Sequence, residues 1–180
     1  MNFFEMLTLS KKLSFVDGRV LLFNQGISIY PARSMMNYMK LINNDPDSIK
    51  LIYSMAKQSM MDHKQDLLTA HDPSNAVSWV INTINLYGLG KMEYLSKTLE
   101  GEITIENSPF VENLKGTVSV PVDNITRGII AGIVSSISNF DYDVIELNCA
   151  AVNGDKCKLI IYKKENLLSK FPLECKSQIL

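Results

Sequence analysis

Residues 142–163 read YDVIELNCAAVNGDKCKLIIYK and carry the strongest fold signal in the chain. Apolar side chains dominate two runs, from Tyr142 to Val152 and from Lys156 to Lys163, and the polar turn Asn153-Gly154-Asp155 separates them. Asn, Gly and Asp favour turns because they tolerate the backbone angles that turns need. The stretch therefore predicts two antiparallel strands joined by a hairpin.

The N-terminal part of the chain also begins with strand signals. Asp17-Gly18 lies between the apolar positions around Phe15 and the run from Val20 to Phe23, and Asp-Gly is a strong hairpin signal. A further short strand is expected from Ile27 to Tyr30.

Helical spacing replaces strand alternation in the next part. Apolar residues recur every three or four positions from Met35 to Ile42, which predicts a helix. A second helix is expected to start at Pro46 after the N-cap Asp45. A third helix is expected from Pro73, after the N-cap Asp72, to the C-terminal glycine Gly88.

Strand-like alternation returns from Lys91 to Ile105 and from Thr117 to Val122, and a helix is then expected from Asp123 or Asn124 to about Ser138. With the closing hairpin, this order predicts an α+β fold in which a helical layer packs on one antiparallel sheet. We expect residues 1–163 to form a single domain and residues 164–180 to form an amphipathic tail.

The composition indicates a soluble globular protein. The 180 residues include 46% apolar side chains, and 18 basic and 19 acidic residues leave a net charge of -1. A charge so close to zero gives no general attraction to nucleic acid or to an anionic membrane, so neither partner is expected. Three cysteines form no disulfide framework, and residues 1–6 do not resemble a signal peptide, so we expect a cytoplasmic location.

A candidate zinc site lies in the closing hairpin. Glu146, Cys149 and Cys157 offer one carboxylate and two thiolates, three of the four ligands that zinc prefers. Residues three apart in a regular strand point to opposite faces, so joint ligation by Glu146 and Cys149 requires a β-bulge or a strand that ends before Cys149. A three-residue hairpin loop would place Cys157 on the same face as Cys149. The alternative is two buried cysteines in a sheet beside a solvated glutamate.

Several motifs resemble the 4-vinyl reductase domain family. They are a helix with G-x-x-x-G at residues 125–133, E-x-x-C at 146–149, and a Gly-Asp turn followed by C-x-[FL] at 154–159. Residues 52–57 (IYSMAK) resemble the family's LYxxGK helix, and residues 106–110 (ENSPF) resemble its xNSP strand end. The match covers roughly residues 11–163.

The resemblance implies both a fold and a function. The family is similar in fold to the sensor domains of phenol- and xylene-responsive activators and to subunits of vesicle-tethering complexes. It implies a sensor or regulatory domain that binds a small hydrophobic molecule and holds a structural zinc ion. The zinc ligands would be Glu146, Cys149 and Cys157, with Asp123 at the position where the aromatic sensors have a further cysteine.

Methionines and aromatic residues mark a candidate ligand pocket. Six of the nine methionines lie between residues 35 and 61, and methionine suits both irregular cores and adaptable apolar pockets. The resemblance implies a ligand cavity between helices and sheet, and a methionine-rich core is the alternative. The candidate ligand-binding residues are Trp79, Tyr53, Met55, Tyr87 and Met39.

Other residues favour structural interpretations. Gly128 and Gly132 are expected to allow close packing on the sheet or on a partner helix, and Cys175 is expected to be an exposed, inert thiol. His63 and His71 are expected on the surface.

No dinucleotide-binding, P-loop, GxSxG or HExxH motif is present, so the sequence favours a binding protein over an enzyme. We expect a homodimer. The alternatives are a homodimeric scaffold of the same fold without ligand and an accessory factor in porphyrin or lipid biosynthesis.

Overall fold

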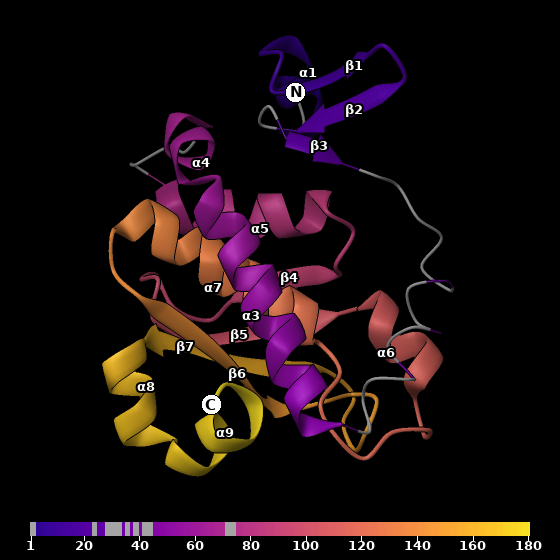
Figure 1. The fold of residues 1–180 in the computed structure, drawn as a ribbon, viewed down its shortest axis with the longest axis vertical. Helices are drawn as coiled ribbons and strands as arrows, with labels where there is room; N and C mark the ends of the chain where they lie inside the picture. Colours follow the sequence, from indigo (N-terminus) through magenta and orange to yellow (C-terminus); the bar gives the residue numbers. More distant parts are fainter. Residues whose placement is uncertain are drawn as a thin grey trace.

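The computed structural model describes residues 3–22, 25–27, 34, 37, 40, 45–70 and 75–180, and it confirms the α+β class (Figure 1). The helices are α1 (Phe3–Leu9), α3 (Pro46–Asp62), α4 (Lys64–Ala70), α5 (Ala76–Leu86), α6 (Pro109–Leu114), α7 (Asn124–Ser138), α8 (Lys164–Lys170) and α9 (Pro172–Gln178). The strands are β1 (Leu13–Val16), β2 (Arg19–Leu22), β3 (Gln25–Ile27), β4 (Lys91–Tyr94), β5 (Gly101–Glu106), β6 (Tyr142–Asn148) and β7 (Cys157–Lys163).

The strands form two antiparallel sheets and not the single sheet expected. One sheet has the order β1-β2-β3 and the other the order β4-β5-β7-β6. The expected hairpin at Asp17-Gly18 is confirmed, because both residues have positive φ angles (50° and 75°) between the paired residues Val16 and Arg19. Short strands joined by such tight turns pair with their neighbours in sequence. Figure 1 shows the resulting small sheet beside α1 at one end of the molecule.

Helix α7 lies at the centre of the fold. It contacts α3, α4, α5 and β6, and most of its residues are buried. A Cβ atom at Gly128 would lie 2.5 Å from the carbonyl oxygen of Tyr53, and one at Gly132 would clash with the carbonyl oxygen of Lys57. The two glycines therefore let the backbones of α7 and α3 approach closely, which confirms the packing interpretation and identifies the partner helix.

The C-terminal tail covers the face of the larger sheet opposite α7. Ile145 of β6 and Ile160 of β7 form a separate apolar cluster with Leu167 of α8 and Cys175 of α9. Residues 164–180 thus bury apolar side chains of α8 and α9 against the sheet. The prediction of an exposed Cys175 is wrong: the cysteine lies on the apolar face of α9, and the polar neighbour Lys176 points outward.

Helix ends match the sequence signals where these are described. The Asp45 side chain accepts hydrogen bonds from the N–H groups at the start of α3, and Gly88 has a φ of 69° just after α5. The expected strand from Thr117 to Val122 is absent, since these residues form turns and irregular backbone, and Pro121 lacks the N–H that a strand ladder needs. Helix α6 instead begins at Pro109. The helix expected from Met35 to Ile42 and the cap Asp72 fall outside the described ranges, apart from single positions.

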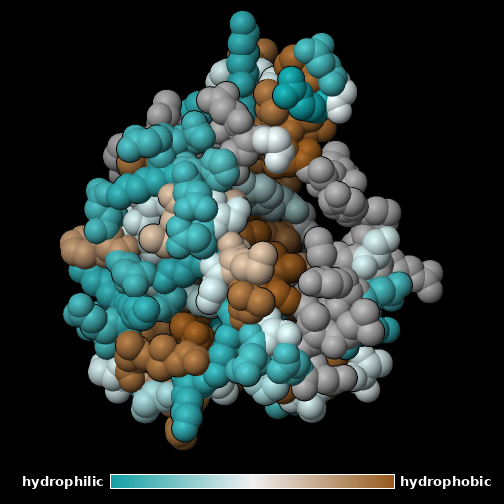
Figure 2. Space-filling view, in the orientation of Figure 1, coloured by the Kyte–Doolittle hydropathy of each residue, from teal (hydrophilic) through white to brown (hydrophobic). Residues whose placement is uncertain are grey.

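The molecular surface is mixed in character. Among the coloured residues in Figure 2 hydrophilic ones predominate, and hydrophobic residues reach the surface near the middle of the view. Leu51 and Met55 of α3 are among the exposed large apolar residues. None of the helices within the described ranges has both the length and the apolar composition of a membrane span.

Candidate metal centre

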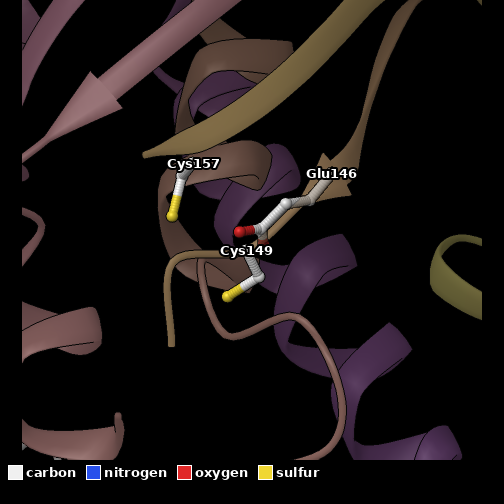
Figure 3. Close-up of side chains that lie close together, drawn as sticks. All are labelled: Glu146, Cys149 and Cys157. Carbon is white, nitrogen blue, oxygen red and sulfur yellow. The ribbon is translucent and has the colours of Figure 1, made fainter. Parts of the chain in front are cut away.

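Three side chains that are separated in sequence meet at one end of the larger sheet (Figure 3). One carboxylate oxygen of Glu146 and the Sγ atoms of Cys149 and Cys157 all lie within 4.8 Å of one another. All three residues are buried. Among the described residues this is the one group of three or more His, Cys, Asp or Glu side chains with such spacing.

The pairing of β6 with β7 explains how Glu146 and Cys157 come together. Glu146 lies opposite Leu159, and Cys157 is two residues from Leu159 along β7, so both side chains project from the same face of the sheet. The same face carries Val144, which packs in the main core beneath α7.

Cys149 reaches the same point because the strand is interrupted before it. The register shifts between Glu146 and Asn148, and β6 ends at Asn148. Both conditions stated from the sequence for joint ligation are therefore met. The expected short hairpin loop is longer, residues 149–156, and it begins with a turn in which the N–H groups of Val152 and Asn153 donate to the Cys149 carbonyl at 3.0 and 3.1 Å.

Asp123 lies next to the cluster at the N-terminus of α7. Its carboxylate accepts a 2.6 Å hydrogen bond from the Ser108 hydroxyl, and its backbone N–H donates to Glu146 Oε2 at 3.2 Å. Asp123 is fully buried, although its carboxylate is outside the group of three defined above. The N-terminal end of a helix carries partial positive charge, which favours an anionic side chain there.

The surroundings shift the pKa values of the cluster in opposite directions. Burial, followed by the charges of Asp123 and Cys149, raises the pKa of Glu146 well above its ordinary value. Burial also raises the pKa of Asp123, against the opposing effect of the nearby Cys157 thiol and the Ser108 hydroxyl. The Cys157 thiol lowers the pKa of Cys149 to about 6, and Cys149 in turn raises the pKa of Cys157. The two thiols together therefore lose one proton more readily than they lose two, and the pair then carries a single negative charge.

Two buried oxygen atoms of this cluster have no hydrogen-bond partner within the described part of the chain. They are Glu146 Oε1 and Asp123 Oδ2. Unpaired buried carboxylate oxygens are costly, and a bound cation would supply the missing interaction. Two thiolates with one or two carboxylates form a donor set that suits zinc. The residues present therefore fit the metal that the sequence predicts.

Arg127 is a buried cation beside this cluster that sequence analysis did not single out. Its Nη1 atom donates to the Val144 carbonyl at 3.0 Å, and its Nη2 atom donates to Asn124 Oδ1. The guanidinium carbon lies 5.0 Å from the centre of the Tyr53 ring. Burial lowers the pKa of Arg127, whereas the charge of Glu146 raises it. Arg127 therefore supplies positive charge to a region rich in buried carboxylates.

The candidate ligand-binding residues do not all lie together. Tyr53 and Trp79 are buried in the main core cluster, and Tyr87 packs against it. Met55 lies apart from these three: its side chain is 62% exposed, because it is two residues from Tyr53 and therefore projects from the opposite side of α3. Met39 lies outside the described residues.

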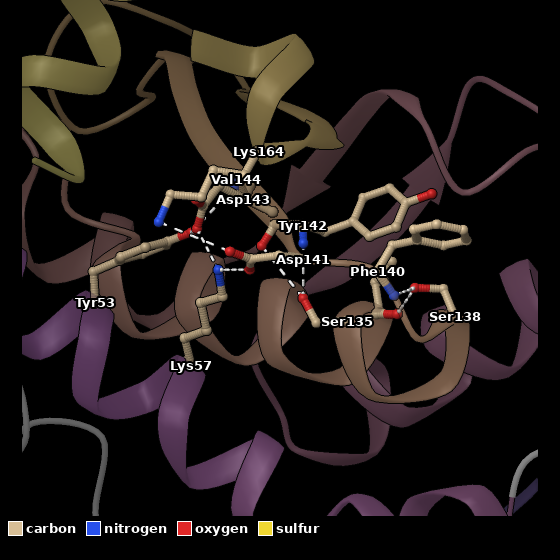
Figure 4. Close-up of polar contacts among 11 residues, drawn as sticks. Tyr53, Lys57, Ser135, Ser138, Phe140, Asp141, Tyr142, Asp143, Val144 and Lys164 are labelled. Carbon is tan, nitrogen blue, oxygen red and sulfur yellow. Dashed lines mark hydrogen bonds and ion pairs between the residues drawn. The ribbon is translucent and has the colours of Figure 1, made fainter.

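Tyr53 also belongs to a polar network that its sequence position did not predict (Figure 4). Its hydroxyl donates to Asp143 Oδ1 at 2.6 Å and accepts from the N–H of Val144 at 3.1 Å. The Lys57 ammonium lies 2.7 Å from the same Asp143 oxygen and 2.6 Å from Asp141 Oδ1. Burial, followed by the Asp143 charge, raises the pKa of Tyr53 well above its ordinary value. The network joins α3 to the start of β6.

Comparisons with known proteins identify the fold. No protein-family model and no curated protein matches the sequence. The structure is similar to the phenol-responsive sensory domain of the transcription activator PoxR, determined with phenol, with a TM-score of 0.73, 15% identity and 88% coverage of each chain. It is also similar to a vinyl-4-reductase family protein from Methanocaldococcus jannaschii, with a TM-score of 0.54, 16% identity, and coverage of 76% of this chain and 83% of that one. The chain thus has the 4-vinyl reductase-like fold that its motifs indicated.

Proposed function

We propose that this chain is a sensor domain that binds a small hydrophobic molecule and is stabilised by a structural zinc ion. The ligands would be Glu146, Cys149 and Cys157, with Asp123 as the fourth. The observation that carries the metal site is the convergence of three buried donor atoms within 4.8 Å beside two unpaired carboxylate oxygens. Four protein ligands fill a tetrahedral site, which is the arrangement of structural zinc.

The proposed zinc ion would cross-link four segments of the chain. Glu146 comes from β6, Cys149 from the following loop, Cys157 from the start of β7 and Asp123 from the N-cap of α7. A zinc ion bound there supplies no reaction chemistry, and its effect is to fix the hairpin against the helix. The site is therefore expected to stabilise the fold.

The proposed ligand is a small apolar or phenol-like molecule held between the helices and the larger sheet. Support comes from the likeness in fold to a sensory domain that responds to phenol. Trp79, Tyr53 and Tyr87 would contact the ligand, and Met39 remains a candidate. Burial raises the pKa of Tyr87 to about 12, so its phenol stays protonated and able to donate a hydrogen bond.

The proposal also covers organisation and location. Residues 1–163 would form one ligand-binding domain with residues 164–180 as its tail, and the domain would act as a homodimer in the cytoplasm, where reduced thiols are available to zinc. Ligand binding would change the association of the chain with itself or with a partner.

Native mass spectrometry of freshly purified protein tests the proposal. The expected result is one zinc ion per chain without added metal, together with a co-purified small molecule or uptake of added phenol. A zinc content well below one per chain would contradict the metal site. An empty dimer that takes up no phenol would favour the scaffold alternative.

Replacing Trp79 with alanine is expected to weaken phenol binding by about tenfold. An aromatic contact contributes about 0.5–1.5 kcal/mol beyond its buried area, and 1.4 kcal/mol is a tenfold change in affinity. The substitution should also cost about 3–5 kcal/mol of stability, so titration calorimetry must be done at a temperature at which the variant is folded.

Leu167→Ala is the matched control for Trp79→Ala. Leu167 is equally buried, but it lies in the tail cluster on the other face of the sheet. If both variants lose phenol affinity to the same extent, Trp79 acts only as a core residue.

A further inference from the structure

The side chain of Gln178 in α9 holds the backbone of Glu146. The N–H of Glu146 donates to Gln178 Oε1 at 2.8 Å, and Gln178 Nε2 donates to the Glu146 carbonyl at 2.9 Å. Gln178 is only 7% exposed. Because β6 is an edge strand of the larger sheet, this amide satisfies the outward N–H and C=O groups that a neighbouring strand would otherwise pair.

This contact lies where it can influence the position of the Glu146 side chain in the metal centre. The register of β6 against β7 shifts immediately after Glu146, so the strand ladder fixes the backbone less firmly there. The Glu146 carboxylate is one of the three convergent donors. Gln178 therefore restrains the backbone of Glu146, a candidate metal ligand, at the point where pairing with β7 fixes that backbone less firmly.

A cavity borders helix α9 on one side. Its Cys175 packs in the apolar cluster on the sheet, next to Ile145 and Ile160. On the side towards α3, a cavity of about 210 Å³ is lined by Pro46, Ile49 and Pro121 together with Gln178 and other residues. The contact with Glu146 is thus made by a short helix that packs on the sheet and borders this cavity.

We propose that Gln178 is a positioning residue for the metal centre, so that docking of α9 on β6 and retention of zinc at Glu146 favour each other. The inference rests on the proposed zinc site. Two binding events that share one element are linked reciprocally. Bound zinc must therefore stabilise the docking of α9 by the same free energy by which docked α9 stabilises bound zinc. Hydrogen-bond partners of metal ligands commonly change metal affinity by 10- to 100-fold.

Zinc release from the full-length protein tests this inference. Gln178→Ala is expected to release zinc to a chromogenic chelator about tenfold faster than the wild type. Ser177→Ala, an exposed neighbour whose hydroxyl bonds only within α9, should release zinc at the wild-type rate. Val134→Ala, in the buried part of α7, provides a destabilised variant that keeps the Gln178 side chain. If Gln178→Ala releases zinc no faster than Val134→Ala, the inference is wrong while the metal centre stands.

Hydrogen exchange in the wild type gives a second measurement that needs no variant. The N–H of Glu146 has its acceptor on α9, so chelation of zinc is expected to speed its exchange at least tenfold, more than that of the N–H of Tyr142, whose acceptor is Ser135 Oγ of α7. Equal changes at the two amides would overturn the coupling. A wild type that binds no zinc would overturn the metal centre itself, and the inference with it.

Discussion

Replacing Cys149 with serine is expected to remove the bound zinc and to lower the free energy of unfolding by at least about 4 kcal/mol. A metal that is present at a thousand times its dissociation constant stabilises the native state by about that amount. Structural zinc in zinc-finger peptides reaches roughly 10–16 kcal/mol. Serine is a poor zinc ligand and would leave Glu146 and Cys157 without their shared cation. Metal analysis and urea unfolding measure the two effects.

Cys175→Ser is the control for this experiment, because Cys175 is also a buried cysteine but lies in the tail cluster away from Glu146. Chelation with EDTA should lower the stability of the wild type and of Cys175→Ser, and should leave Cys149→Ser unchanged. Zinc must displace protons from thiols, so the metal contribution should weaken as the pH falls through the Cys149 pKa of about 6. An unchanged wild-type stability in EDTA would mean that the cysteines are ordinary core residues.

The candidate site was largely predictable from local sequence. The alternation of apolar residues in the closing strands and the polar turn between them predict a hairpin, and a hairpin brings Cys149 and Cys157 near each other. The same reasoning showed that Glu146 and Cys149 could act together only if the strand bulged or ended, and the structure has both features. Period-two geometry could state these conditions because all three donors lie within twelve residues of one another, but it left open whether they are met.

The surroundings of the site were not predictable in this way. Arg127 appears in the sequence as one charge inside an apolar helix, and its burial follows from α3 and β6, which cover it from distant parts of the chain. Gln178 bonds to a backbone 32 residues away, and no sequence pattern marks a contact between a side chain and a remote backbone. Thr117 to Val122 alternates as a strand would, but alternation cannot show whether a partner strand is available. These features depend on tertiary packing and not on local spacing.

Replacing Arg127 with methionine is expected to cost about 3–5 kcal/mol of stability at neutral pH in the zinc-free protein. Removing one member of a buried charge group leaves its partners uncompensated, and that is the typical cost. Methionine keeps a similar volume, so the change removes the charge and the two hydrogen bonds from Arg127 to Val144 and Asn124 with little change in packing. Urea unfolding in EDTA separates this effect from any loss of metal.

The pH dependence of the Arg127→Met penalty identifies its cause. The folded-state pKa of Glu146 is raised, so the folded protein binds that proton more tightly than the unfolded chain, and stability falls as the pH rises from about 4.5 through the raised value. Arg127 opposes this rise, so the loss of Arg127 should raise the Glu146 pKa further. The stability penalty of Arg127→Met should therefore be larger towards neutral pH and smaller near pH 4, where the Glu146 carboxyl is protonated in the folded and the unfolded protein. Lys158→Met, which removes a half-buried cation paired with Glu102, should cost no more than about 1 kcal/mol. A charge interaction of Arg127 with Glu146 and Asp123 disappears when those groups are protonated. If the penalty for Arg127→Met stays constant between pH 4 and 7, its cause is therefore lost hydrogen bonds and packing and not lost charge.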